Sequence, residues 1–74
     1  MTMIRLARYY DRSNPAKDRI TMQFYPDGDQ HEISESMYLL ALGDMGERWT
    51  TDNPAARVTI GTISADKRQE YGRC

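Results

Sequence analysis

Residues 33–49 read ISESMYLLALGDMGERW and contain the only long helical pattern in the chain. Ser34 is a good N-cap, because its hydroxyl can accept a hydrogen bond from a free amide of the first turn. Glu35 follows at the positive end of the helix dipole, and Ile33 and Tyr38 have the spacing of a hydrophobic staple. We therefore expect a helix that begins after Ser34 and against which the strands pack.

One stripe of this helix is predicted to face the core. At about 100° per residue, five apolar side chains fall on that stripe, namely Tyr38, Ala41, Leu42, Met45 and Trp49. Leu40 points nearly opposite, beside Asp44 and Glu47, and is either a single exposed leucine or a contact for another chain. Gly43 and Gly46 each disfavour a helix interior by about 1 kcal/mol relative to alanine, so the regular helix is expected to end early.

Size and composition narrow the class of protein. A chain of 74 residues makes one small domain, which buries only about 60% of the surface that its unfolded chain exposes. The only cysteine is Cys74, which excludes an intrachain disulfide and a cysteine-rich metal site. No apolar run approaches the ~18 residues of a membrane span, and no signal-peptide pattern follows Met1. These features predict that the protein resides in a reducing compartment. We expect this compartment to be the cytoplasm, or the cytoplasm of the host cell if a phage encodes the protein.

The net charge of -1 hides an uneven distribution of charge along the chain. Residues 20–47 contain six acidic residues and no lysine or arginine, whereas both flanking segments carry a basic excess. The six acidic residues are Asp27, Asp29, Glu32, Glu35, Asp44 and Glu47. This asymmetry predicts either a solubilising surface or a contact with a protein that has a basic surface, because complementary charge speeds association.

Two segments before the helix have the alternation of β-strands. In residues 2–10, Ile4 and Leu6 share one face. In residues 19–25, the apolar residues that alternate with polar ones are Ile20, Met22 and Phe24. A polar loop over residues 11–18 joins the two strands, and Pro26-Asp27-Gly28 predicts a tight turn. Residues 29–32 either return as a short strand or lead as a loop into the helix.

The chain after the helix is expected to add one strand. Residues 50–56 are predicted to form a loop, and residues 57–63 to form the last strand, with Val58 and Ile60 facing the core. Its outward residues would be Thr59, Gly61 and Ile63. The polar segment 65–74 is either a short helical turn or a frayed tail outside the domain of residues 1–64. The order ββ(β)αβ predicts an α+β fold with one helix on a three- to four-stranded, mainly antiparallel sheet.

One helix can cover only one face of such a sheet. The predicted residues of the uncovered face are Arg5, Tyr9, Thr21, Gln23, Tyr25, Thr59 and Ile63. Antiparallel sheets often have a solvated face, but tyrosine and arginine are also enriched at protein interfaces. Both interpretations stay open at this point.

The sequence lacks a pattern that carries catalytic or metal chemistry. Residues 27–32 fail the calcium-loop pattern, since His31 takes the fifth position and Glu32 the position of the glycine. A metal site of Asp27, Asp29 and His31 is conceivable, but turns are rich in aspartate for backbone reasons. No nucleophile motif accompanies the sole histidine. We therefore expect no metal, no cofactor and no enzymatic activity.

The leading hypothesis is a small non-catalytic module that binds another protein through the acidic turn and helix or through the open sheet face. Many small proteins of phages and mobile elements that inhibit host complexes share these traits, and this analogy of size class includes such an inhibitor in the hypothesis. The predicted contact residues are Asp27, Asp29, Glu32, Glu35, Leu40, Asp44, Glu47 and Tyr25.

Two other functions compete with this hypothesis. The first is a small regulatory nucleic-acid-binding protein, because aromatic side chains can stack on bases while cations hold phosphates. Its contact residues would be Arg5, Arg8, Tyr9, Arg12, Lys17 and Arg19. The acidic middle of the chain argues against it, since broad nucleic-acid binding needs a basic face. The second is a homodimeric structural protein joined through the open sheet face or an edge strand.

Overall fold

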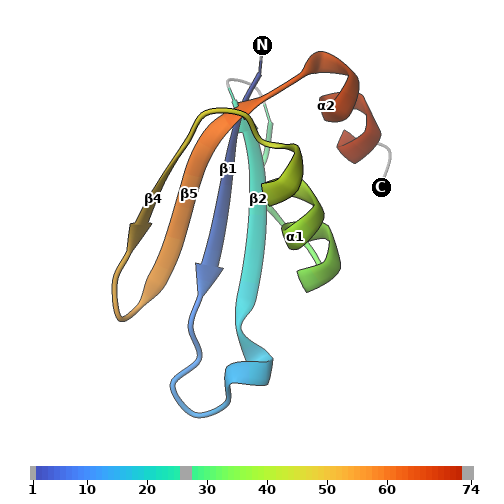
Figure 1. The fold of residues 1–74 in the computed structure, drawn as a ribbon. Helices are drawn as coiled ribbons and strands as arrows, with labels where there is room; N and C mark the ends of the chain where they lie inside the picture. The colour runs from blue at the N-terminus through green and yellow to red at the C-terminus, as the bar shows by residue number, and fades with distance from the viewer. Residues whose placement is uncertain (1, 26–27, 73–74) are drawn as a thin grey trace.

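The computed structural model describes residues 2–25 and 28–72, which form one antiparallel sheet with helices on one face (Figure 1). The strands in this part of the chain are β1 (Thr2–Tyr9), β2 (Arg19–Tyr25), β3 (His31–Glu32), β4 (Arg48–Asp52) and β5 (Ala56–Ile63). The α-helices are α1 (Glu35–Asp44) and α2 (Ala65–Gly72), and a short 3-10 helix spans Pro15–Lys17 between β1 and β2.

The sheet has the strand order β3-β2-β1-β5-β4, and every neighbouring pair is antiparallel. The predicted α+β class and the antiparallel sheet are thus confirmed. The finer prediction differs, because the described chain forms five strands and two α-helices in place of three or four strands and one helix. Residues 31–32 form the short strand β3, which was one of the two alternatives for this segment.

Helix α1 begins where the sequence predicts it. The Ser34 hydroxyl accepts a hydrogen bond from the Met37 amide at 3.2 Å, and Glu35 lies in the first turn. The helix ends at Asp44, consistent with the two glycines nearby. Tyr38 and the following stripe residues Ala41 and Met45 are buried, while Leu42 is half-buried.

Trp49 does not belong to this stripe, and that prediction was wrong. Its side chain is 63% exposed and lies in β4, which pairs along its length with β5. Residues 48–52 include a tryptophan and two threonines, types that favour strands, and the ladder with β5 supplies hydrogen bonds that a last helical turn lacks. Asn53 closes the hairpin, since its amide donates to the Ala56 carbonyl at 3.0 Å. The predicted loop over residues 50–56 is accordingly shorter.

The orientation predicted for the last strand was also wrong. Thr59, Gly61 and Ile63 face the helices and are buried, whereas Val58 and Ile60 lie half-buried on the other face. The register explains this, because Thr59 pairs with the core residue Leu6 and Gly61 pairs with Ile4. Gly61 fits beneath the end of α1, where a Cβ atom would lie 2.6 Å from Met45 Cε. Alternation alone does not decide the orientation of a strand that is apolar on both faces.

Residues 65–72, for which a short turn or a tail was expected, form α2 and pack on the core. The Ser64 hydroxyl accepts a hydrogen bond from the Lys67 amide at 3.3 Å and so caps the helix. Tyr71 lies against Phe24, with 6.3 Å between ring centroids, and its hydroxyl donates to Asp44 of α1 at 2.6 Å. Helix α2 therefore joins α1 in covering the same face of the sheet (Figure 1).

The buried core lies between this face and the two helices. Its apolar members come from both helices and from the three central strands, and they are Ile4, Leu6, Ile20, Met22, Phe24, Tyr38, Ala41, Met45, Ile63 and Tyr71. No described segment covers the opposite face of the sheet.

Candidate functional site

The uncovered face of the sheet, which we call the open face, is the first candidate site. Because side chains alternate along strands, the strand register gathers every second residue of β1, β2, β4 and β5 there. These residues are Met3, Arg5, Ala7, Tyr9, Arg19, Thr21, Gln23, Tyr25, Trp49, Thr51, Ala56, Val58, Ile60 and Thr62. Of the predicted uncovered residues, Arg5, Tyr9, Thr21, Gln23 and Tyr25 lie here, and Thr59 and Ile63 do not.

Large apolar side chains are exposed on the open face. Trp49 is 63% exposed, and Met3 and Tyr9 are each 37% exposed. Trp49 pairs with Ile60, which in turn pairs with Arg5, so that these three side chains form one row across three strands. A face that gathers several exposed apolar side chains is a better candidate for an interaction site than a single exposed residue is.

Arg5 places one charge near the centre of this face. It is half-buried between Ile60 and Gln23 on the neighbouring strands, and it forms an ion pair with no carboxylate of the described residues. The other cation on this face is Arg19 at the β2 end, which is bonded to Glu32 of β3. The open face thus has one guanidinium group without a carboxylate partner.

The predicted acidic surface is largely paired within the chain. Glu32 is bonded to Arg19, Glu35 lies 3.1 Å from Arg8, and Asp44 accepts the Tyr71 hydrogen bond. Asp44 also forms an ion pair with Lys67, whose Nζ lies 4.0 Å from Asp44 Oδ1. Asp29 and Glu47 are exposed, while Asp27 lies outside the described residues. The structure therefore does not gather these carboxylates into one free surface.

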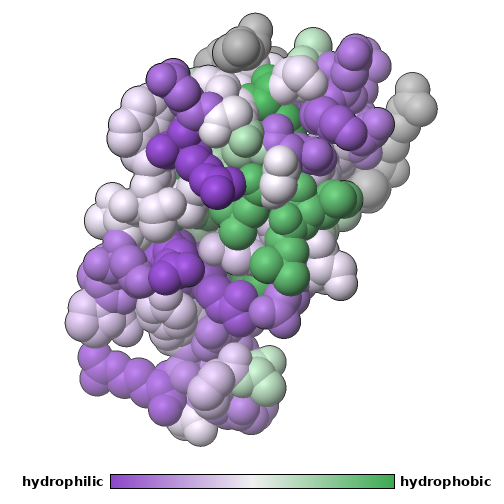
Figure 2. Space-filling view, viewed as in Figure 1, coloured by the Kyte–Doolittle hydropathy of each residue, from purple (hydrophilic) through white to green (hydrophobic). Residues whose placement is uncertain are grey.

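The outer side of α1 is a second, smaller apolar surface. Leu39 and Leu40 are 60% and 61% exposed, and Figure 2 shows the apolar patch that spreads over α1 beside the hydrophilic residues of α2. Leu40 is thus not an isolated exposed leucine, because its neighbour is equally exposed.

The six residues predicted for nucleic-acid contact are divided between different parts of the molecule. Arg5, Tyr9 and Arg19 lie on the open face. Arg8 points to the helix side, where it bonds Asp18 and Glu35 at 3.1 Å each. Arg12 and Lys17 are exposed in the connection between β1 and β2. No single surface carries all of them.

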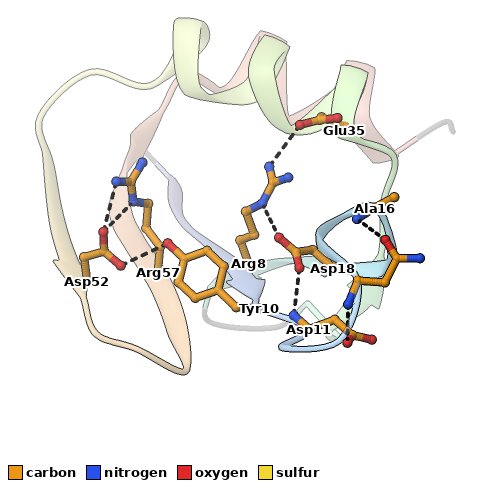
Figure 3. A network of polar contacts seen from close by, with 9 residues as sticks. Arg8, Tyr10, Asp11, Ala16, Asp18, Glu35, Asp52 and Arg57 are labelled. Atoms are coloured by element: carbon orange, nitrogen blue, oxygen red, sulfur yellow. Dashed lines mark hydrogen bonds and ion pairs between the residues drawn. The ribbon is translucent and has the colours of Figure 1, made fainter.

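Sequence reasoning missed a polar network on the helix side of the sheet (Figure 3). Arg57 donates to Asp52 from Nε and Nη2, at 3.3 and 3.0 Å, and the Tyr10 hydroxyl donates to the other oxygen of Asp52 at 3.0 Å. The bonds from Arg57 and then from Tyr10 lower the pKa of Asp52. Burial and then the bond to Asp52 raise the pKa of Tyr10. Recognising β4 and the Asn53 turn would have placed Asp52 beside Arg57.

The described residues contain no group of three or more histidine, cysteine, aspartate or glutamate side chains that could hold a metal ion. Within the same part of the chain, neither helix is long and apolar enough to cross a membrane. A scan of protein-family models, a search of curated proteins and a search of solved structures each returned no match.

Proposed function

We propose that this protein is a non-catalytic binding module. Its open face would dock a segment of another protein that presents an acidic side chain among apolar ones. The observation that carries this proposal is the row of Trp49, Ile60 and Arg5, which stays uncovered because both helices pack on the opposite face.

The apolar part of this face supports binding on energetic grounds. Tryptophan and arginine are the residue types that most often dominate interface energies. A buried tryptophan removes roughly 150–250 Å² from water, and Trp49 is still 63% exposed. Covering the exposed part would contribute on the order of 3 kcal/mol at ~25 cal/mol per Å². Trp49 is therefore the residue whose burial by a partner would contribute most.

Arg5 determines the charge that the partner should carry. Covering a guanidinium group without a hydrogen-bonding partner is costly, and Arg5 has no carboxylate partner within the described residues. A carboxylate from the docked segment would satisfy it with two parallel hydrogen bonds, which is the strongest geometry for such a pair. For this reason we favour an acidic residue at the centre of the docked segment.

The charges on the open face also argue against nucleic acid and against a second copy of the chain as its binding partner. Nucleic-acid affinity depends on neutralising several phosphates, and on the open face Arg19 is already bonded to Glu32, which leaves Arg5 alone. A second copy of the chain, paired about a two-fold axis through the middle of the face, would bring the two Arg5 side chains together. Like charges brought face to face in this way disfavour a homodimer.

A library of random peptides displayed on phage tests the proposal. Peptides selected on the intact protein should be enriched in an acidic residue flanked by apolar ones. Each should shift the fluorescence of Trp49, the only tryptophan, to shorter wavelength as water is excluded. Arg5→Glu should weaken binding at least tenfold, because arginine hot spots contribute about 2 kcal/mol or more.

Arg12→Glu provides the matched control, since it makes the same charge change at an exposed residue away from the open face. Retained binding in this variant would support the assignment to Arg5. Peptides without acidic enrichment, or peptides that bind Arg5→Glu unchanged, would contradict the proposal. Loss of binding on Leu40→Asp alone would move the docking site to α1, and a concentration-dependent dimer that buries Trp49 would assign the face to a second copy.

A further inference from the structure

A cavity of about 160 Å³ lies on the other side of the sheet, between α1 and the β4–β5 hairpin. It is lined by Tyr38, Leu42, Arg48, Thr50, Arg57 and Thr59. Two of these residues are cationic, three carry hydroxyl groups, and none is acidic. The volume is far above the ~10–15 Å³ of such space that one water molecule needs in a cavity, so a small polar ligand fits.

Two arginines on adjacent strands lie beside this cavity. Arg57 on β5 is directly opposite Arg8 on β1, and both side chains extend toward α1 (Figure 3). Like charges directly opposite one another on adjacent strands are destabilising. Carboxylates flank the pair on its outer sides, with Asp52 beside Arg57 and Asp18 and Glu35 beside Arg8 (Figure 3). None of these carboxylates lines the cavity itself.

Arg48 adds a cation that lacks a carboxylate partner. Among the described residues it forms no ion pair, and its Nη1 donates to the Leu42 carbonyl near the end of α1. This bond offsets the partial negative charge at the C-terminal end of the helix. It uses one of the five N–H donors of the guanidinium group, which leaves donors and a full charge for a ligand.

The hydroxyl groups of Thr50 and Thr59 provide a further hydrogen-bond donor. Thr50 Oγ1 and Thr59 Oγ1 lie 3.2 Å apart, and the Thr59 residue is only 1% exposed. One hydroxyl donates to the other, so the hydrogen of the accepting hydroxyl remains available. The described lining therefore combines two guanidinium groups with the free O–H of the threonine pair and with Tyr38, and it contains no carboxylate.

We propose that this cavity binds a small tetrahedral oxyanion, the chemistry shared by inorganic phosphate and a phosphomonoester. Arg48 would neutralise its charge, and Arg57, which donates to Asp52 from Nε and Nη2, would donate a second charge-assisted hydrogen bond from Nη1. The threonine pair would donate a third bond. This site is separate from the open face, so the two proposals stand or fall independently.

Titration of the ¹⁵N-labelled protein with inorganic phosphate and, separately, with O-phosphoserine tests the site. Both series are followed by NMR at constant ionic strength maintained with chloride. Saturable shifts are expected in the amides of Thr50 and Thr59 and in the Nε–H groups of Arg48 and Arg57. The anion that saturates at lower concentration identifies the source, free or esterified. Shifts that rise linearly in both series, or that spread over all exposed arginines, would overturn the proposal.

Arg48→Gln should weaken binding on the order of tenfold or more, because it removes a charged donor. Arg12→Gln is the matched control, which loses the same charge at an exposed position outside the cavity, and binding should be unchanged. Thr50→Val, at an exposed strand position, should weaken binding several-fold and remains informative if Arg48→Gln fails to fold. Equal affinity in Arg48→Gln, Thr50→Val and the intact protein would overturn the assignment.

Discussion

The two faces of the sheet have similar apolar content but different surroundings. Ile4 on the helix side is fully buried, whereas Ile60 on the adjacent strand lies on the open face and is only half-buried. Phe24 is covered by Tyr71 of α2, while Trp49 on the other side is 63% exposed. The path of the chain, and not the composition of a strand, therefore determines which face becomes core. The uncovered apolar face contributes less to folding and is available for binding.

The largest predicted effect is a difference between two chemically identical substitutions. Ile4→Ala should reduce the free energy of unfolding by about 3 kcal/mol, because it opens a cavity in the core. Ile60→Ala should reduce it by about 1 kcal/mol, since its side chain is already partly in water. Urea unfolding followed by circular dichroism measures both values. Equal losses would mean that the open face is covered in solution, and the contrast between the faces would disappear.

A smaller effect is predicted where α2 closes the covered face. Tyr71→Phe keeps the ring against Phe24 but removes the hydroxyl bond to Asp44. We expect a loss of about 1–2 kcal/mol in the free energy of unfolding, as for a hydrogen bond to a charged acceptor. Hydrogen exchange of the α2 amides should accelerate at the same time. Tyr10→Phe removes a bond to the exposed Asp52 and should reduce the free energy of unfolding less than Tyr71→Phe does. A larger loss in Tyr10→Phe than in Tyr71→Phe would contradict this role of α2.

Replacing Trp49 should have almost no effect on folding. Trp49→Thr should change the free energy of unfolding by less than about 0.5 kcal/mol, as is usual for surface positions, because threonine also suits a strand. In the intact protein, the Trp49 emission should lie at long wavelength and acrylamide should quench it efficiently. A large destabilisation, or emission from a dry environment, would show that the open face is already occupied.

Acid should weaken the helix side of the sheet through Asp52. Bonds from Arg57 and Tyr10 hold the pKa of Asp52 below its ordinary value of 3.8. A carboxyl group whose pKa is lowered by folding stabilises the folded state above the unfolded pKa. That contribution is lost as the pH falls through the folded pKa, which places the loss below about pH 4. Urea midpoints measured from pH 7 to pH 2 should fall less steeply in Asp52→Asn, whereas an identical slope would contradict the role of this group.

Parts of this fold could be predicted because local chemistry determines them. Ser34 caps α1 as expected, and the alternation in β1 and β2 assigns Ile4, Leu6 and Met22 to the core correctly. The orientation of β5 could not be predicted, because Ile60 and Ile63 are apolar on opposite faces and only the pairing with β1 distinguishes them.

The candidate sites were less predictable than the fold, because they depend on contacts between distant segments. Arg5 and Tyr25 were expected on an uncovered face, and both lie there. Trp49 was assigned to the helix, and this error hid the most exposed aromatic side chain of that face. The cavity beside α1 was not foreseen, since it requires that β4 exist and that Arg48 and Arg57 lie on the same side of the hairpin.

The alternation along β4 has a consequence for changes in chain length. Arg48 and Thr50 point toward α1, while Trp49 between them points the other way. Deleting or inserting one residue in the Asn53 turn would shift β4 by one position against β5, and such a slip turns every side chain of a strand over. Tryptophan would then enter the cavity, and arginine and threonine would replace it on the opposite side. The three-residue turn at residues 53–55 therefore has to keep its length for both the open face and the cavity beside α1, although it is part of neither.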